Sequence, residues 1–178
     1  EQVQKQNAAP EVSPVNTNIA DNAPKAVDAL SSKAIASSQI VSVIKTAKNI
    51  IEIDNLGRIA QVTLLEDKYK DENGNQIKLF EANQLRPLEV RFADTNLNTE
   101  AFKVSVVASS ANIDATTSVQ ELVLTQSLGG SVLTKKLTIY PDGHYDLTVS
   151  ATNDKQFFIT NGFRPNVLAD MYAVHGLI

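Results

Sequence analysis

From Gln39 onward, apolar and polar residues alternate with a period of two, and turn signals interrupt the alternation at short intervals. Successive side chains of an extended strand point to opposite faces, so this pattern predicts short strands that each bury one face. No long helical period and no repeat of fixed spacing occurs in this region. The sequence therefore predicts an all-β fold, an antiparallel β-sandwich. Besides the two arms of a hairpin around residues 140–143, the expected strands are 39–46, 49–54, 58–66, 87–94, 102–109, 119–126, 156–160 and 172–178.

The segment PLEVRFAD shows the alternation most clearly. Its apolar residues Leu88, Val90 and Phe92 are expected to face the core, while Glu89 and Arg91 are expected to face solvent. This arrangement is typical of a strand that lies with one face on the core of a sandwich.

Residues 1–38 differ in composition from the rest of the chain. They contain three of the six prolines, no glycine and no aromatic residue, and they are rich in Ala, Asn, Gln and Ser. Such a segment buries too little apolar surface to offset the entropy lost on ordering, which favours a flexible linker. A short helix within residues 25–37 is the alternative for part of it. The folded domain is therefore expected over residues 39–178.

The composition excludes several classes of function. The net charge of −4 provides no basic surface for nucleic acid. The chain has no cysteine, so it has no disulfide, thiol nucleophile or thiolate metal site. The two histidines, His144 and His175, have no carboxylates around them at the spacing of a metal site. The sequence predicts no cofactor, no metal site and no nucleic-acid partner.

One stretch, LTIYPDGHYDLTVS, contains residue types that also occur in catalytic sites. Residues 140–143 form a strong turn signal, and His144, Asp146, Thr148 and Ser150 follow at every second position. Same-face neighbours in a strand lie about 6.6–6.8 Å apart, so Ser150 is expected about 20 Å from His144. Proton transfer requires about 2.6–3.2 Å. The four residues are therefore interpreted as the solvated face of a β-hairpin, and no catalytic residue is assigned.

Four segments in a fixed order resemble the large periplasmic domain of the YidC family of bacterial membrane-protein insertases. They are IIEIDNLGRIAQVTLLEDKY, LRPLEVRFAD, LTKKLTIYPDGHYDLTVSATN and FFITNGFRPNVLADMYAVHG, and together they cover roughly residues 40–178. They carry an [IL]-[DN]-x-x-G-[RG]-[IV] turn, a Leu-Thr-Lys-x-Leu strand and a Tyr-Asp-Leu-x-Val return strand. The Tyr-Pro-Asp-Gly turn and the Gly-Phe-Arg-Pro stretch are similar to the version found in epsilonproteobacteria.

The resemblance implies a fold and a location. The family domain is a large β-supersandwich that resembles galactose mutarotase, and a transmembrane helix and a polar linker precede it. Residues 1–38 would then be that linker, on the periplasmic face of the bacterial inner membrane. The family domain is longer than residues 39–178, so the chain is expected to end inside it, at Ile178. Strand edges would then lack their partners, and such edges favour association.

The resemblance also implies a function. In this family a membrane-embedded helical core performs insertion, and no stretch here has the run of about 18 apolar residues that spans a bilayer. The implied role is a noncatalytic accessory domain that contacts the Sec translocon (SecDF and the translocon channel) and nascent membrane proteins. The alternative is a ligand-binding sandwich whose cleft holds an extended peptide, a lipid-like chain or a carbohydrate. A mutarotase-like enzyme is a third hypothesis, for which no acid and base can be matched. No residue is assigned to partner binding.

Overall fold

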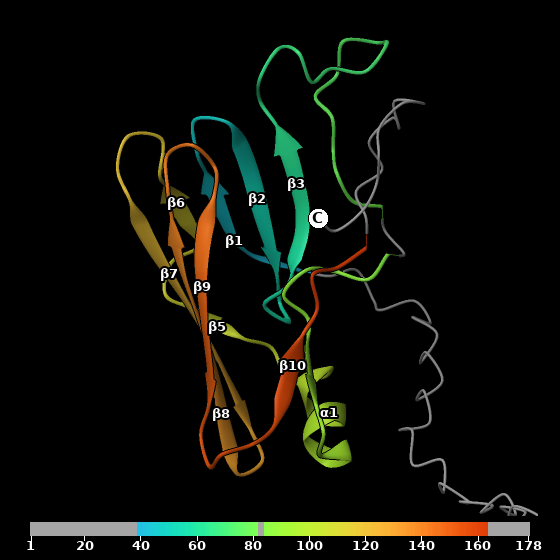
Figure 1. Ribbon diagram of the computed structural model, residues 1–178, viewed down its shortest axis with the longest axis vertical. Helices are drawn as coiled ribbons and strands as arrows, with labels where there is room; N and C mark the ends of the chain where they lie inside the picture. The colour runs from blue at the N-terminus through green and yellow to red at the C-terminus, as the bar shows by residue number, and fades with distance from the viewer. Residues whose placement is uncertain (1–38, 82–83, 164–178) are drawn as a thin grey trace, which may run out of the picture. The chain divides into compact units, whose positions relative to one another are not determined.

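The computed structural model describes residues 39–81 and 84–163, which form two four-stranded sheets and a two-stranded ribbon (Figure 1). The first sheet has the strand order β3-β2-β1-β6, and the second has the order β5-β7-β8-β9. The ribbon pairs β10 with β4. The elements are β1 (Ile40–Lys45), β2 (Asn49–Asp54), β3 (Ile59–Leu64), β4 (Val90–Phe92), α1 (Thr95–Ala101), β5 (Val107–Ala108), β6 (Asn112–Asp114), β7 (Gln120–Leu128), β8 (Ser131–Ile139), β9 (Tyr145–Ala151) and β10 (Phe157–Ile159).

The two four-stranded sheets face each other across an apolar core. Buried residues alternate along β7 and β8 as the sequence predicts, because every second side chain points into the space between the sheets. The predicted all-β sandwich is confirmed. One pair differs from the antiparallel expectation, since β6 pairs in parallel with β1. The core includes Ile44, Ile51, Ile53, Ile59, Leu122, Leu124, Leu137 and Ile139.

A second apolar cluster lies where α1 packs beside the ribbon and the ends of β7 and β8. The helix begins after Asp94, whose Oδ1 accepts hydrogen bonds from the backbone N–H groups of Asn96 and Leu97. This N-cap provides partners for amides that have none within the helix. Leu97 and Ala101 are four residues apart and both are buried in the cluster. Its buried members are Val90, Phe92, Leu97, Ala101, Leu128 and Leu133.

The strand predicted over residues 102–109 is wrong for most of its length. Only Val107–Ala108 form β5, and the preceding segment leaves α1 as an irregular connection. The Gln126 side chain explains this course, because its Nε2 donates to the carbonyls of Ala101 at 2.9 Å and Val104 at 2.6 Å. These two carbonyls are therefore bonded by a side chain and not by a neighbouring strand.

The prediction that Glu89 faces solvent is also wrong. Leu88 has a φ of +64°, in the left-handed region that a leucine rarely adopts. This turn of the backbone interrupts the alternation, so Leu88 and Glu89 are both buried, with 4% and 5% of their surface exposed. The alternation resumes in β4, where Val90 and Phe92 are buried and Arg91 is half-buried.

Three sequence expectations lie outside the described residues: the linker over 1–38, the strand over 172–178 and His175. Within residues 39–81 and 84–163, no helix has the length and apolar character needed to cross a membrane.

Candidate functional site

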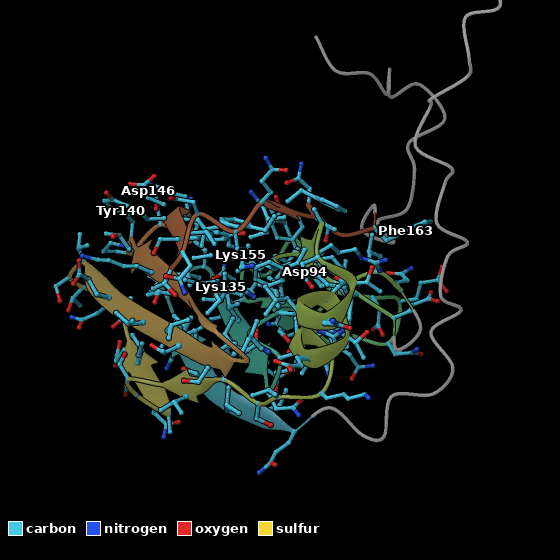
Figure 2. All side chains as sticks on the ribbon, turned by 90° about the horizontal axis from the view of Figure 1, so that it is seen from below. Asp94, Lys135, Tyr140, Asp146, Lys155 and Phe163 are labelled. Carbon is cyan, nitrogen blue, oxygen red and sulfur yellow. The ribbon has the colours of Figure 1, made fainter. Side chains whose placement is uncertain are left out.

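The hairpin formed by β8 and β9 carries the polar residues that the sequence singles out. His144, Asp146, Thr148 and Ser150 are all exposed, so this face is solvated as predicted. The rings of Tyr140 and His144 stack with their centroids 4.1 Å apart. Tyr140 Oη donates to Asp146 Oδ2 at 2.9 Å, on the outer surface shown in Figure 2. None of these contacts joins His144 to the hydroxyl of Thr148 or Ser150.

The tip of this hairpin is docked on the turn between β1 and β2. The backbone N–H of Ala47 donates to the carbonyl of Pro141 at 3.0 Å, and Asn49 Nδ2 donates to the carbonyl of Gly143 at 3.3 Å. Gly143 has a φ of +95°, and a Cβ there would lie 2.5 Å from Asn49 Nδ2. The tip therefore ties one sheet to the other, which is a structural role.

The variant His144→Ala is expected to change the free energy of unfolding by no more than about 0.5 kcal/mol. Its side chain is 57% exposed, and its bond to the Asp142 carboxylate lies in solvent, where such a pair contributes little. Urea unfolding of both proteins measures the change. A partner that binds the wild type but not the correctly folded variant would contradict this expectation and make the polar face a binding surface.

Four charged side chains are buried together near the ends of β2 and β4 and the middle of β8. Asp54, Arg58, Glu89 and Lys135 have exposed fractions of 0%, 4%, 5% and 1%. Charged residues are almost never buried to this degree unless they are paired. This buried charge cluster is therefore the first candidate for a catalytic or binding site in the described structure.

Arg58 links the two buried carboxylates of the cluster. Its Nε and Nη2 contact Asp54 Oδ2 at 2.9 and 2.8 Å, and its Nη1 contacts Glu89 Oε2 at 3.1 Å. Asp54 Oδ1 accepts the backbone N–H groups of Leu56 and Arg58 at 3.0 Å each. The second oxygen of Glu89 accepts Nε and Nη2 of Arg91 at 3.0 and 2.7 Å. Each carboxylate thus has a guanidinium partner.

Lys135 reaches the same cluster from β8 and binds backbone carbonyls. Its Nζ donates to the carbonyls of Leu88 at 2.7 Å and Gly57 at 2.8 Å, and Leu56 O lies 3.5 Å away. Burial lowers the pKa of Lys135 to about 8, against the opposing attraction of the Asp54 carboxylate. The amine therefore fastens the β2–β3 turn and the segment before β4 to the centre of the second sheet.

Two features of the sequence mark this cluster, although alternation alone does not reveal it. Lys135 occupies the same strand face as Leu133 and Leu137, so a cation stands at a core-facing position. Asp54 and Arg58 flank a turn of the type Asp-x-x-Gly-Arg, where an aspartate commonly accepts nearby backbone amides. The inward direction of Glu89 carries no such signal, because it depends on a backbone break in the preceding residue.

The cluster leaves too little space for a substrate. The cavity beside it measures about 10 Å³, and its lining includes Leu56, Glu89, Gln126 and Lys135. That volume holds about one water molecule. Since Lys135 is 1% exposed and already bonded to carbonyls, its amine has no access to a substrate. The cluster therefore supports the fold.

A second hollow lies on the face of the first sheet that is turned away from the core. It measures about 360 Å³, and Val43, Lys45, Ile50, Asn112 and Asp114 are among its lining residues. The sequence singles out none of these residues as a site. In the part of the chain that the structure describes, no group of three or more histidine, aspartate and glutamate side chains is arranged to hold a metal ion.

Three membrane protein insertases are similar in sequence to this chain. The insertase YidC of Campylobacter jejuni is 35% identical over 180 residues, a match that covers 99% of the chain and 33% of that protein. The insertase YidC of Wolinella succinogenes is 41% identical over 143 residues, covering 80% of the chain and 27% of that protein. The insertase YidC of Helicobacter pylori is 34% identical over 188 residues, covering 92% and 34%. No protein-family model and no solved structure matches the chain.

These relatives agree with the resemblance seen in the sequence, including its epsilonproteobacterial character. The chain spans about a third of the length of the relatives it matches. Its described residues form the expected sandwich. The chain therefore belongs to the YidC family of membrane protein insertases, as a β-sandwich region that corresponds to about a third of the full-length proteins.

Proposed function

We propose that this chain is a noncatalytic accessory domain of a YidC-type insertase, located on the periplasmic face of the bacterial inner membrane. It contacts components of the Sec translocon, SecDF and the channel among them, and segments of nascent membrane proteins. In this proposal residues 1–38 are the linker that connects the sandwich, residues 39–178, to a membrane-spanning segment of the same protein.

The similarity to an insertase over 99% of the chain carries this proposal. The noncatalytic role is supported by the way the described charges are used. Buried Asp54, Arg58 and Glu89 pair with one another, and buried Lys135 binds backbone carbonyls. The polar face of the β8–β9 hairpin holds no proton-transfer array. The proposed role instead requires a surface that binds other polypeptides.

Exposed aromatic side chains at the C-terminal end of the described region provide a candidate contact surface. Phe158 of β10 and Phe163 are 58% and 57% exposed. The backbone N–H of Phe163 donates to the carbonyl of Leu85, which is itself 39% exposed, so these two apolar residues lie on adjacent segments. Figure 2 shows Phe163 at the margin of the described residues. Aromatic residues are enriched at protein interfaces, which makes this the first surface to probe.

The test is photo-crosslinking in living cells, with the chain carried in the full-length insertase. The probe is placed in turn at Phe158, Phe163, Lys136 and Asp146, and at Asn73 in an exposed loop as the control. We expect adducts with a Sec component or a nascent chain at the aromatic positions, identified by mass spectrometry. Adducts with nascent chains alone would remove the Sec component from the proposal. Labelling no stronger than at Asn73 would overturn it.

The alternative function, a ligand held in the cleft of the sandwich, has no support in the described interior. Ile44, Leu122, Leu124 and Leu137 fill the space between the sheets and are at most 1% exposed. Such close packing leaves no room between the described layers for a sugar or an acyl chain.

A further inference from the structure

The dipeptide Asn-Gly occurs twice in the sequence, at Asn73–Gly74 and at Asn161–Gly162. An asparagine before a glycine is prone to spontaneous deamidation, because glycine has no side chain to obstruct attack by its own backbone nitrogen on the asparagine. Both asparagines are exposed, so exposure does not distinguish them. Their reactivity therefore depends on how firmly the surrounding backbone is held.

The reaction itself requires only water. The backbone nitrogen of the glycine forms a bond to Cγ of the asparagine, which closes a succinimide ring. The bond from Cγ to the side-chain nitrogen breaks, and ammonia leaves with the proton that the glycine nitrogen gave up. Water then opens the ring, at Cγ to give aspartate or at the main-chain carbonyl to give isoaspartate. Ring closure needs a rotation of the peptide between the two residues, which a packed backbone resists.

The first pair lies at the tip of the loop that follows β3 (Figure 1). A Cβ placed on Gly74 would meet no atom within 4 Å, so the space around this glycine is open. The backbone nitrogen of Gly74 donates to the carbonyl of Asp71 at 2.9 Å, and that of Asn73 donates to Asp71 Oδ1 at 2.9 Å. Both restraints come from one exposed residue nearby, so a small local opening frees the peptide.

The second pair is packed against a segment distant in the sequence, residues 85–89. A Cβ placed on Gly162 would lie 2.6 Å from the backbone nitrogen and Cδ of Pro87. Before the pair, Thr160 N donates to the carbonyl of Glu89 at 2.9 Å, and after it Phe163 N donates to the carbonyl of Leu85 at 2.9 Å. Rotation of the peptide between Asn161 and Gly162 would therefore disturb tertiary contacts on both sides.

We propose that Asn73 is a site of spontaneous deamidation in this chain, and that the fold protects Asn161 from the same reaction. The product carries a new carboxylate beside Asp71 and Glu72, and the net charge changes from −4 to −5. Isoaspartate also adds a methylene group to the main chain at the loop tip. This inference does not depend on the proposed role in insertion.

The change should stay confined to the tip, because the base of the loop is bonded to β3. Leu64 N donates to the carbonyl of Ile77 at 3.0 Å, and Leu79 N donates to the carbonyl of Val62 at 3.0 Å. Neither bond involves the residues that react. We therefore expect the modified chain to keep the thermal midpoint of the unmodified one.

The test compares the two asparagines within the same molecules. The chain is incubated in mildly alkaline buffer, and peptide mapping by mass spectrometry measures the conversion of each asparagine with time. In the folded chain we expect Asn73 to react at least about tenfold faster than Asn161, the factor that corresponds to roughly one more hydrogen bond broken. In urea that unfolds the chain, both glycines lose their contacts and the two rates should become similar.

The variant Asp71→Ala tests whether the loop restrains its own reaction. Its carboxylate accepts the backbone nitrogens of Asn73 and Asn75 at 2.9 and 2.8 Å, so its removal should speed deamidation of Asn73 about fivefold and leave Asn161 unchanged. Asp67→Ala is the matched control. It removes an exposed carboxylate of the same loop that pairs with Lys70 at 2.8 Å.

Four results would overturn the proposal. Equal rates at the two asparagines in the folded chain would show that packing at Gly162 gives no protection. A difference that persists in urea would show that the neighbouring sequence, and not the fold, sets the rates. Asp71→Ala reacting no faster than Asp67→Ala would remove Asp71 as the restraint. If Asn73 reacts in this chain but stays unmodified in the full-length insertase in membranes, another segment holds the loop there, and the proposal fails for the whole protein.

Discussion

Replacing Arg58 with methionine is expected to lower the free energy of unfolding by about 3–5 kcal/mol, the usual cost of removing one partner of a buried ion pair. Arg58 contacts Asp54 at 2.8 Å and Glu89 at 3.1 Å, and both carboxylates are nearly inaccessible to water. After the substitution Asp54 keeps two backbone amides and Glu89 keeps Arg91, but neither carboxylate keeps its central cation. Thermal unfolding should show a fall of roughly 10 °C in Tm.

A matched control separates this effect from the loss of a surface ion pair. Lys155 lies 3.8 Å from Asp94, with 38% and 43% of the two side chains exposed (Figure 2). Lys155→Met should therefore change stability by less than about 0.5 kcal/mol. Adding Asp54→Asn to Arg58→Met should recover part of the loss, because the asparagine oxygen still accepts the two backbone amides without carrying a buried charge. A double variant no more stable than Arg58→Met would show that the lost packing, and not the unpaired charge, causes the effect.

Lys135→Met should lower the free energy of unfolding by about 1–3 kcal/mol at pH 7. The difference in this free energy between the wild type and the variant should grow as the pH rises. The neutral-pH loss arises because the carbonyls of Gly57 and Leu88 lose their buried donor. The pH dependence arises because the folded-state pKa of Lys135 is about 8 and its ordinary value is 10.5. Between these values the unfolded chain binds more protons than the folded one, so wild-type stability increases with pH. The charged groups of Arg58, Asp54 and Glu89 surround the side chain at position 135 in the wild type and in Lys135→Met alike.

Relative to Lys135→Met, the free energy of unfolding of the wild type should therefore increase by about 2 kcal/mol between pH 7 and pH 9.5. Urea unfolding of both proteins at the two pH values measures this difference. The adjacent Lys136 is the control: it points to the opposite face and pairs with Glu121 at 2.6 Å in solvent. Lys136→Met should change stability by less than about 0.5 kcal/mol at pH 7. A wild-type advantage over Lys135→Met that narrows with increasing pH would show that the buried amine stays charged.

The contrast between Lys135 and Lys136 shows how far sequence reasoning extends here. The period of two places these neighbours on opposite faces of β8, and the structure buries one and exposes the other. The pattern does not show which groups bind the Lys135 amine, because the carbonyls of Leu56, Gly57 and Leu88 come from segments that are 47 to 79 residues away. The sequence shows that a lysine faces the core, but it does not show which groups accept its hydrogen bonds.

The sequence by itself determined the fold class, the hairpin at residues 140–143, its solvated polar face and the family. Each of these depends on local features: alternation, turn chemistry and the order of short motifs. Only the tertiary structure decided that Glu89 points inward and that residues 95–101 form a helix. The physical reason is the same in each case. The positive φ at Leu88 is a single backbone angle, and the seven-residue helix that Asp94 caps makes only about two turns, so neither leaves a period in the sequence.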